Sequence, residues 1–215
     1  MNEQQKAFWD AIDVFDKEGV LPYVMLIGSW AEYIYQYYFK TNFIPNLRTR
    51  DVDFLYPNLK RPQEYGFNIF KSMQEKGFAY REDYMSGVGK FMKEDLLELE
   101  FITRVLGKGQ YINEIPSLNI KSEGLREINM LAEYPLELEC ENYIITVPEP
   151  EAYIIQKLLI NPIRTPEYKR EKDIQAIKEL LDHVNRNRLN QIFGERSLKI
   201  QKSISETLAK HFIEI

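Results

Sequence analysis

The sequence predicts an α+β fold: a mixed sheet of about five strands with flanking helices on one face, followed by a helical C-terminal bundle. Strand-length segments, either apolar throughout or alternating, occur only between residues 22 and 147. After the sequence VPEP, apolar residues recur at helical spacing to the end of the chain. Because Pro148 and Pro150 separate the two patterns, we expect two domains, residues 1–148 and 149–215.

Each expected element of the first part follows from spacing and from its end signals. Gly19 and Gly77 each end a run of helical spacing, and Gly87 with Gly89 indicates a loop or hairpin. In the segment LELEFI, apolar and acidic residues alternate as in a half-buried strand. The elements, in chain order, are a helix at 3–18, a strand at 22–27, a helix from 29, a loop at 41–50, a strand at 51–56, a helix at 62–76, a loop or hairpin at 84–93, and strands at 97–102, 135–140 and 142–147.

The C-terminal part reads as helical throughout. No segment after Pro150 shows the two-residue alternation of a strand. The expected helices span residues 150–160, 167–183, 186–193 and 196–212.

The charge is unevenly distributed. The formal net charge is −5, which excludes a polybasic nucleic-acid binder. Residues 94–151 carry thirteen acidic and four basic side chains, whereas residues 157–202 carry eleven basic and six acidic ones. A protein that is acidic overall can therefore still present one basic wall to phosphate.

The single cysteine, Cys140, excludes an internal disulfide and a thiolate zinc cluster, and we expect it to fill core space. The N-terminal residues lack a basic and then apolar leader, and no stretch approaches eighteen apolar residues in a row. We therefore expect a soluble, cytoplasmic protein with no membrane partner.

Gly28 and Ser29 interrupt the stretch YVMLIGSWAEYIYQYYF between a strand and a helix. A helix that starts at Ser29 leaves its first N–H groups without helical partners, and these groups favour an anion. Gly28 would let a phosphate approach the backbone, and the Ser29 hydroxyl could donate to it. The alternative is a tight turn in which Ser29 is an ordinary N-cap.

Asp51 and Asp53 flank Val52, so on a strand both carboxylates point to one face. Aspartate is depleted in strands, but a divalent cation between the two would explain the pair, because Mg²⁺ prefers carboxylate oxygens. Glu98 or Glu100 could add a third carboxylate and complete a site for two metal ions. The alternative is a solvent-facing strand with two surface aspartates.

In this order, the motifs resemble the nucleotidyltransferase fold of the DNA polymerase β superfamily. LRTRDVDFL is similar to the threonine-containing Asp-x-Asp block of its bacterial stand-alone members, and LELEFIT to their third-carboxylate strand. VPEPEAYIIQKLLINPIR with KREKDIQAI is similar to their helical segment, including that of the abortive-infection toxin type. The resemblance spans residues 22 to 183 and departs from the pattern in having Glu where many members have Asp.

The resemblance implies a role for each matching residue. Asp51, Asp53 and Glu100 would bind two Mg²⁺ ions, with Mn²⁺ as the substitute, and Glu100 is preferred to Glu98 because it stands just before FIT. The implied nucleotide-binding residues are Gly28, Ser29, Arg48, Thr49, Lys157 and Asp173. Arg48 and Arg50 flank the aspartates, and whether they neutralise them or contact nucleotide stays open.

The resemblance implies an enzyme that moves a nucleoside monophosphate from a nucleoside triphosphate to an acceptor hydroxyl and releases pyrophosphate. The acceptor could be a small molecule, a protein or a tRNA, and the sequence chooses neither among these nor an oligomeric state. The competing hypothesis is a catalytically silent nucleotide-binding module, or a partner in a toxin–antitoxin pair, with the same fold.

Overall fold

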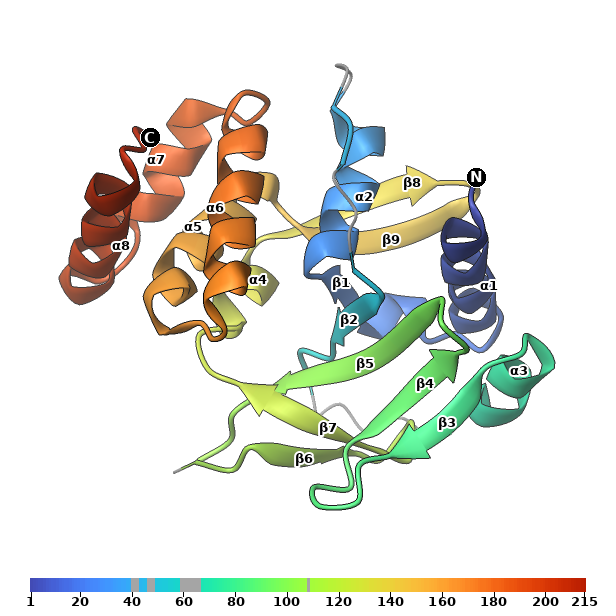
Figure 1. Cartoon of the computed structure of the whole chain (residues 1–215). Coiled ribbons are helices and arrows are strands. Elements are labelled where there is room, and N and C mark those ends of the chain that lie inside the picture. The colour runs from blue at the N-terminus through green and yellow to red at the C-terminus, as the bar shows by residue number, and fades with distance from the viewer. Residues whose placement is uncertain (40–42, 46–48, 59–66, 108) are drawn as a thin grey trace.

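The computed structural model describes residues 1–39, 43–45, 49–58, 67–107 and 109–215. The helices α5 to α8 gather on one side of the molecule and the strands β3 to β7 on the other, with α2 between them (Figure 1). The elements are α1 Glu3–Lys17, η1 Leu21–Tyr23, β1 Met25–Ile27, α2 Ser29–Tyr38, β2 Asp51–Leu55, α3 Ile69–Glu75, β3 Ala79–Glu82, β4 Gly89–Lys93, β5 Leu97–Arg104, β6 Ile112–Ile115, β7 Ile120–Leu125, α4 Asn129–Glu133, β8 Pro135–Cys140, β9 Tyr143–Pro148, α5 Pro150–Ile160, η2 Asn161–Ile163, α6 Glu167–Leu181, α7 Arg186–Gly194 and α8 Leu198–His211.

The main sheet is mixed and has seven strands rather than the five expected. Strand β5 is central: one edge pairs in parallel with β2, and the other edge is shared. The first half of β5 pairs with β4, and its last residues, Ile102 to Arg104, pair with β7. The membership of the sheet also differs from the expectation, because the strands expected at 135–140 and 142–147 form a separate two-stranded sheet, whereas β3, β4, β6 and β7 join the main one. Strands β6 and β7 were not recognised; only the residues of β7 alternate cleanly between buried and exposed, and this segment contains Gly124.

The two faces of the sheet differ. On one face Phe54 and Phe101 pack against Phe15 of α1, with ring centroids 4.9 and 5.6 Å from it. The other face carries the acidic residues of β2 and β5, followed at the strand ends by Leu55 and Ile102. Those two belong to a small second core that reaches α4. The helices on the first face therefore bury the sheet and leave the acidic face for the site.

The C-terminal helices agree with the expectation of a bundle. All four occur, and α5 is buried along most of its length. Strands β8 and β9 form a separate hairpin, as a two-stranded sheet. Strand β9 ends at Pro148 and α5 begins at Pro150, yet one continuous core joins α1 to α8. The division into two domains therefore stays a prediction.

Two local expectations need correction, and one is confirmed. Residues 84–93, expected as a loop or hairpin, form the turn and second strand of a hairpin in which β4 pairs with β3. Residues 21–23 form a 3₁₀ turn, so the expected strand from 22 shortens to β1. The helix expected at 62–76 begins only at Ile69 within the described residues, and 62–66 lie outside them.

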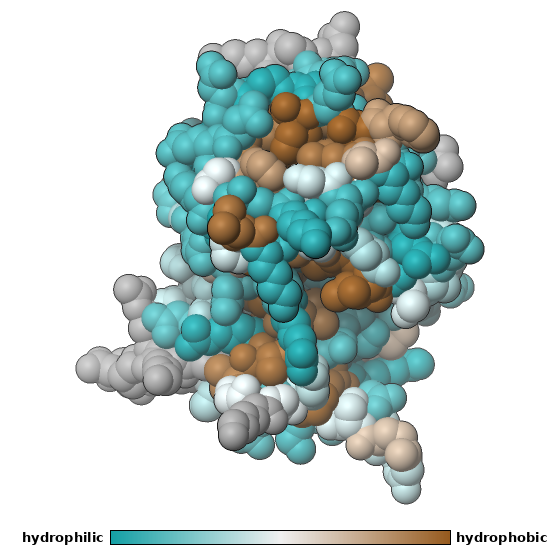
Figure 2. All heavy atoms as spheres, turned by 90° about the vertical axis from the view of Figure 1, so that its left-hand side faces the viewer, coloured by the Kyte–Doolittle hydropathy of each residue, from teal (hydrophilic) through white to brown (hydrophobic). Residues whose placement is uncertain are grey.

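The outer side of the C-terminal helices is mostly hydrophilic. Figure 2 shows this side, where hydrophobic side chains form separate small groups rather than one broad patch. Within the described residues, no helix is both long and apolar enough to cross a membrane.

Candidate active site

The acidic residues of β2 and β5 lie side by side in register. Because the strands are parallel, Asp51 is opposite Glu98 and Asp53 is opposite Glu100. Register partners in a sheet point to the same face, and the residues between them, Val52 and Leu99, are fully buried on the other. The fold thus brings four carboxylates to one face. The sequence analysis expected one glutamate to join the two aspartates, and the register brings both glutamates beside them.

Gly28 lies against this face. Strand β1 runs antiparallel to β2 and pairs Ile27 with Asp53, so the turn that follows passes over the aspartate. The φ angle of Gly28 is +67°, a conformation that side chains disfavour. A Cβ atom at Gly28 would stand 2.6 Å from Oδ2 of Asp53. Only glycine fits this turn, which carries Ser29 as the first residue of α2.

The position of Ser29 corrects one alternative. Gly28, not Ser29, is the N-cap residue of α2, and no side chain caps the helix. The N–H of Ser29 therefore belongs to the first turn, where the helix offers it no carbonyl partner. A helix start without a capping side chain leaves its positive end available to an anion.

Asp53 is the most perturbed carboxylate of the acidic face. Burial raises its pKa to about 7, and the negative charges of Glu100 and Asp51 add to the effect. The positive charges of Arg164 and Lys90 oppose the shift without cancelling it. The ionised form of Asp53 is thus disfavoured by burial first and by its acidic neighbours second, and a cation beside it would stabilise that form.

Lys90 supplies part of the compensation. This residue of β4 is opposite Glu100, and its ammonium group forms an ion pair with the Glu100 carboxylate. Its Nζ atom also lies 3.9 Å from Oε2 of Glu98. Both candidates for the third carboxylate therefore contact one lysine. The contacts do not distinguish Glu98 from Glu100, although Glu100 is the closer partner.

A cleft of about 1000 Å³ opens over the acidic face, between the sheet and the helices α2, α5 and α6. Of the nine predicted site residues, Arg48 lies outside the described part of the chain. The other eight line the cleft: Gly28, Ser29, Thr49, Asp51, Asp53, Glu100, Lys157 and Asp173. The fold therefore collects residues from four distant segments into one site.

Thr49 and Arg50 lie at the entrance to β2. The Thr49 hydroxyl accepts from the Asp51 N–H at 3.1 Å and donates to its carboxylate at 3.4 Å. Arg50 turns away from the aspartates and pairs with Asp95 at 3.2 Å. Of the two roles left open for Arg50, direct neutralisation of the aspartates is not seen.

The Lys157 side chain is buried in an ionic network. Its Nζ atom lies 2.6 Å from Oδ1 of Asp173 and 3.8 Å from Oε1 of Glu32. The Nε atom of Arg164 lies 3.1 Å from Oδ2 of Asp173. The side chains of Lys157 and Asp173 are only 8% and 3% exposed. These two residues therefore brace the back wall of the cleft, next to the helix start at Ser29.

The acidic face has the donor chemistry that a divalent cation requires. Carboxylate oxygens are preferred ligands of Mg²⁺, and burial together with the charges of Glu100 and Asp51 raises the pKa of Asp53. In their present rotamers, the described His, Cys, Asp and Glu residues form no group of three at metal-binding spacing. Asp51 and Asp53 thus fit a metal ion, whereas Glu100 would first have to exchange its lysine partner.

Lys90, Glu32, Tyr153 and Arg164 are among the cleft residues that were not found from the sequence. Lys90 lies in the segment expected as a loop or hairpin, where the alternation of Gly-Lys-Phe-Met was the available signal. Glu32 is buried in α2, and Tyr153 is buried in α5. A carboxylate one turn after Ser29, within an apolar helix face, is the pattern that could have indicated Glu32.

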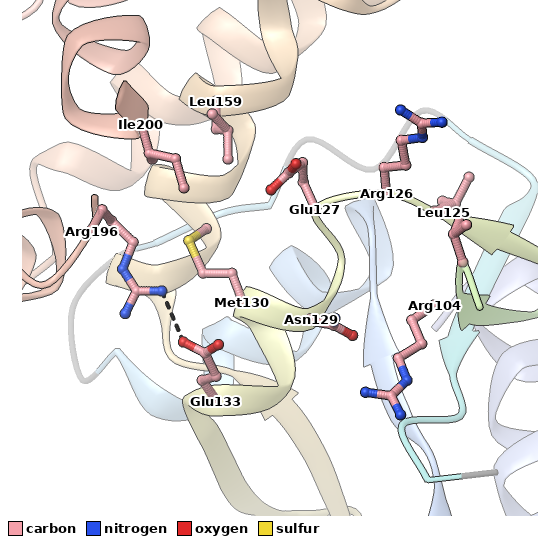
Figure 3. A pocket seen from close by; sticks show the side chains of 11 residues that line it. Arg104, Leu125, Arg126, Glu127, Asn129, Met130, Glu133, Leu159, Arg196 and Ile200 are labelled. Atoms are coloured by element: carbon pink, nitrogen blue, oxygen red, sulfur yellow. Dashed lines mark hydrogen bonds and ion pairs between the residues drawn. The ribbon is translucent and has the colours of Figure 1, made fainter. Parts of the chain in front are cut away.

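A second, smaller cavity of about 340 Å³ lies between β7, α4 and α8 (Figure 3). Arginine side chains from three separate segments of the chain line it: Arg104, Arg126 and Arg196. Arg196 is held by Glu133 at 2.8 Å, as the dashed line in Figure 3 shows. None of the predicted site residues lines this cavity, so the candidate site is the large cleft.

Comparisons with known proteins add independent findings. A family model described as "Nucleotidyltransferase" matches residues 7–201. A comparison with curated protein sequences gives no significant match.

Solved structures share the fold. The chain is similar to an antigenic nucleotidyltransferase-like protein from Paracoccidioides brasiliensis, with 14% identity, a TM-score of 0.59, and coverage of 98% of this chain and 90% of that one. It is also similar to ANT(2")-Ia in complex with adenylyl-2"-tobramycin, with 10% identity, a TM-score of 0.53, and coverage of 98% and 99%. A solution structure of antibiotic-resistance factor ANT(2'')-Ia gives 12% identity, a TM-score of 0.53, and coverage of 98% and 96%. At such low identity these likenesses show a common fold.

Proposed function

The chain belongs to the nucleotidyltransferase family whose model spans residues 7–201, and from this premise we propose the reaction. The protein moves a nucleoside monophosphate from a nucleoside triphosphate to an acceptor hydroxyl and releases pyrophosphate. The observation that carries the proposal is the register of β2 and β5, which sets Asp51 and Asp53 beside Glu98 and Glu100. The acidic face suits the metal ions of a metal-bound nucleoside triphosphate, and the uncapped N-terminus of α2 beside it suits the phosphates.

The roles proposed for the residues follow from their positions in the cleft. Gly28 and Ser29 bind the terminal phosphates through backbone N–H groups and the Ser29 hydroxyl. Asp51 and Asp53 hold Mg²⁺, which when bound neutralises the triphosphate and activates the acceptor hydroxyl. Glu100 is the third ligand and the candidate general base. The chain's own contribution is positioning and charge compensation rather than a covalent intermediate.

Lys157 and Asp173 act from the cleft wall in this proposal. Their ion pair is almost fully buried, which favours a bracing role over direct contact with the whole triphosphate. Arg164 is 38% exposed at its side chain and borders both Asp173 and the cleft. We assign to Arg164 the phosphate contact that the resemblance gave to Lys157.

The acceptor is proposed as a hydroxyl of a small molecule, a protein or a tRNA. The similar protein ANT(2")-Ia was crystallised with adenylyl-2"-tobramycin, a nucleotidylated small molecule. That likeness makes a small molecule the first class to test. The cleft is lined by both acidic and basic side chains, so its charge alone does not select the acceptor.

A catalytically silent nucleotide-binding module, or a toxin–antitoxin partner with this fold, is the second candidate. The ion pair between Lys90 and Glu100 favours it, because a lysine already compensates the third carboxylate. A silent module would bind nucleoside triphosphates through the Ser29 turn and transfer nothing.

Label position distinguishes the reactions. The protein is incubated with Mg²⁺ and each nucleoside triphosphate, labelled with ³²P at the α or the γ position. The acceptor is the small-molecule, protein or tRNA fraction of a cell extract. Transfer of α label with release of pyrophosphate supports the proposal. Transfer of γ label would indicate phosphoryl transfer instead, and binding without transfer would support the silent module.

Two variants make the assay specific. Asp53→Asn removes a carboxylate of the acidic face without changing its size, and α-label transfer should fall by about a thousandfold or more. Asp16→Asn makes the same change on the exposed end of α1, away from the cleft, and should transfer like the wild type. Undiminished transfer by Asp53→Asn would refute the proposed site.

A further inference from the structure

Tyr153 joins the C-terminal helices to the turn that opens α2. Its hydroxyl donates to the Gly28 carbonyl at 3.0 Å and lies 2.6 Å from Oε1 of Glu32. The residue is only 2% exposed, and it lies on the wall of the cleft. Burial keeps its pKa well above the ordinary value, so the hydroxyl retains its proton as a donor.

The Gly28 carbonyl and the Ser29 N–H belong to one peptide unit. In a trans peptide they point in opposite directions, so a bond that fixes the carbonyl also fixes the direction of the N–H. The same carbonyl accepts the first helical bond of α2, from the Ala31 N–H at 3.1 Å. Two donors on one carbonyl polarise the peptide and make its N–H a stronger donor to an anion.

Glu32 completes this arrangement. The Tyr153 hydroxyl has one proton and faces two oxygen atoms. Tyr153 is the donor in both contacts, at 3.0 Å to the Gly28 carbonyl and at 2.6 Å to the Glu32 carboxylate. Burial raises the pKa of Glu32, while the charge of Lys157 and the hydrogen bond from Tyr153 oppose the shift. The hydroxyl is thus shared between Glu32 and the turn, and Glu32 holds it beside the Gly28 carbonyl.

We infer that Tyr153 is a positioning residue for nucleotide binding, because its hydroxyl orients the Gly28–Ser29 peptide toward the phosphates. This inference rests on the proposed function, since it concerns the same site. It assigns to α5 a specific task beyond packing. No contact of Tyr153 with the reacting atoms is required.

Tyr35 offers a matched control. It is a fully buried tyrosine, 5.9 Å from Tyr153 between ring centroids, and its hydroxyl donates to the Pro148 carbonyl at 2.8 Å. Tyr153→Phe and Tyr35→Phe therefore each remove one buried hydroxyl that bonds a carbonyl. Only the first changes the phosphate-facing turn.

Two measurements on the full chain test the inference. Amide NMR spectra of the free protein should show the Ser29 signal displaced in Tyr153→Phe, whereas Tyr35→Phe should displace the signal of Glu149, which follows the carbonyl that it loses. The affinity for α,β-methylene analogues of ATP, GTP, CTP and UTP with Mg²⁺ should fall about three- to tenfold in Tyr153→Phe only. Both variants should lose similar amounts of thermal stability.

The failures are distinguishable. If the wild type binds an analogue and Tyr153→Phe binds it equally well, the inference is overturned while the proposed function stands. Equal losses of affinity in both variants would also overturn it, because they would indicate a general effect of a missing core hydroxyl. If the wild type binds none of the four analogues, the proposed function fails and the positioning role fails with it.

Discussion

Gly28 and Asp53 are in contact across the site: a Cβ atom on the first would stand 2.6 Å from a carboxylate oxygen of the second. The turn proposed to bind phosphate and the strand proposed to bind metal are thereby in contact. Each of the following predictions concerns one residue or ion pair of the cleft.

Gly28→Ala should disable the site with a moderate loss of stability. The added methyl group meets Asp53, and the φ angle of +67° becomes strained, which together cost about 1–3 kcal/mol of folding free energy. Nucleotide transfer should fall at least tenfold because Asp53 must move. Gly194→Ala is the control, since a methyl group there meets nothing within 4 Å. Activity assays and thermal melts of both variants check the prediction.

Asp53→Asn should stabilise the metal-free protein above neutral pH. The folded pKa of about 7 exceeds the ordinary 3.8, so folding favours the protonated form. Below pH 3.8 the Asp53 carboxyl is protonated in both the folded and the unfolded wild type, so it costs no folding free energy. As the pH rises toward 7, the unfolded chain loses this proton more readily than the folded one, and the free energy of unfolding falls. Asparagine has no charge to bury. At pH 8 with EDTA, the Asp53→Asn variant should therefore be more stable than the wild type by about 2 kcal/mol or more.

Urea unfolding of wild type and Asp53→Asn at pH 4, 6 and 8 measures this difference. The gap should widen from pH 4 to pH 8, and added Mg²⁺ should narrow it by stabilising the wild type. A gap that is constant with pH would show that folding does not raise the pKa of Asp53.

Lys90→Met should make the thermal stability of the protein more dependent on divalent cations. Without its ammonium group, Glu98 and Glu100 lose a positive neighbour and the apo protein should melt several degrees lower. Addition of Mg²⁺ should then raise the melting temperature more than it does in the wild type. Lys93→Met is the control on the same strand, because its partner is Asp10 at 2.8 Å, away from the cleft. Equal Mg²⁺ responses in all three proteins would contradict the prediction.

Lys157→Met should strongly destabilise the fold by leaving Asp173 buried with less compensation. Breaking a buried pair by removing one partner costs about 3–5 kcal/mol. The double variant Lys157→Met with Asp173→Leu should recover part of this loss, since neither charge remains buried. Urea unfolding of both single variants and the double variant gives the coupling energy. Additive losses would show that the pair, at 2.6 Å, contributes little.

Much of this site follows from the sequence because its residues lie next to regular elements. Asp51 and Asp53 alternate with apolar residues on β2, and Gly28 separates β1 from α2, so spacing marks them as candidates, and the family resemblance supplies their implied roles. The strand pairing is different. The register of β2 with β5 depends on contacts between residues 47 positions apart, such as Asp51 and Glu98, and no local spacing encodes it.

The parts not predicted share a physical cause. Lys90, Glu32 and Tyr153 are recognised by what they touch across the cleft, not by their neighbours in the chain. Strand β6 was missed because its four residues contain two polar ones, Asn113 and Glu114. Asn113 is buried and bonds Thr103 at 2.9 Å, so tertiary hydrogen bonds compensate for a weak strand pattern.

The bond between Tyr153 and Gly28 also bears on the order in which the molecule can be built. It links residues 125 positions apart, so it cannot form on the ribosome until most of the chain has emerged. The turn and the two aspartates are synthesised early, yet their final geometry depends on a helix made late. A nascent or truncated chain that ends before α5 would carry the Gly28–Ser29 turn without the hydrogen bond from Tyr153.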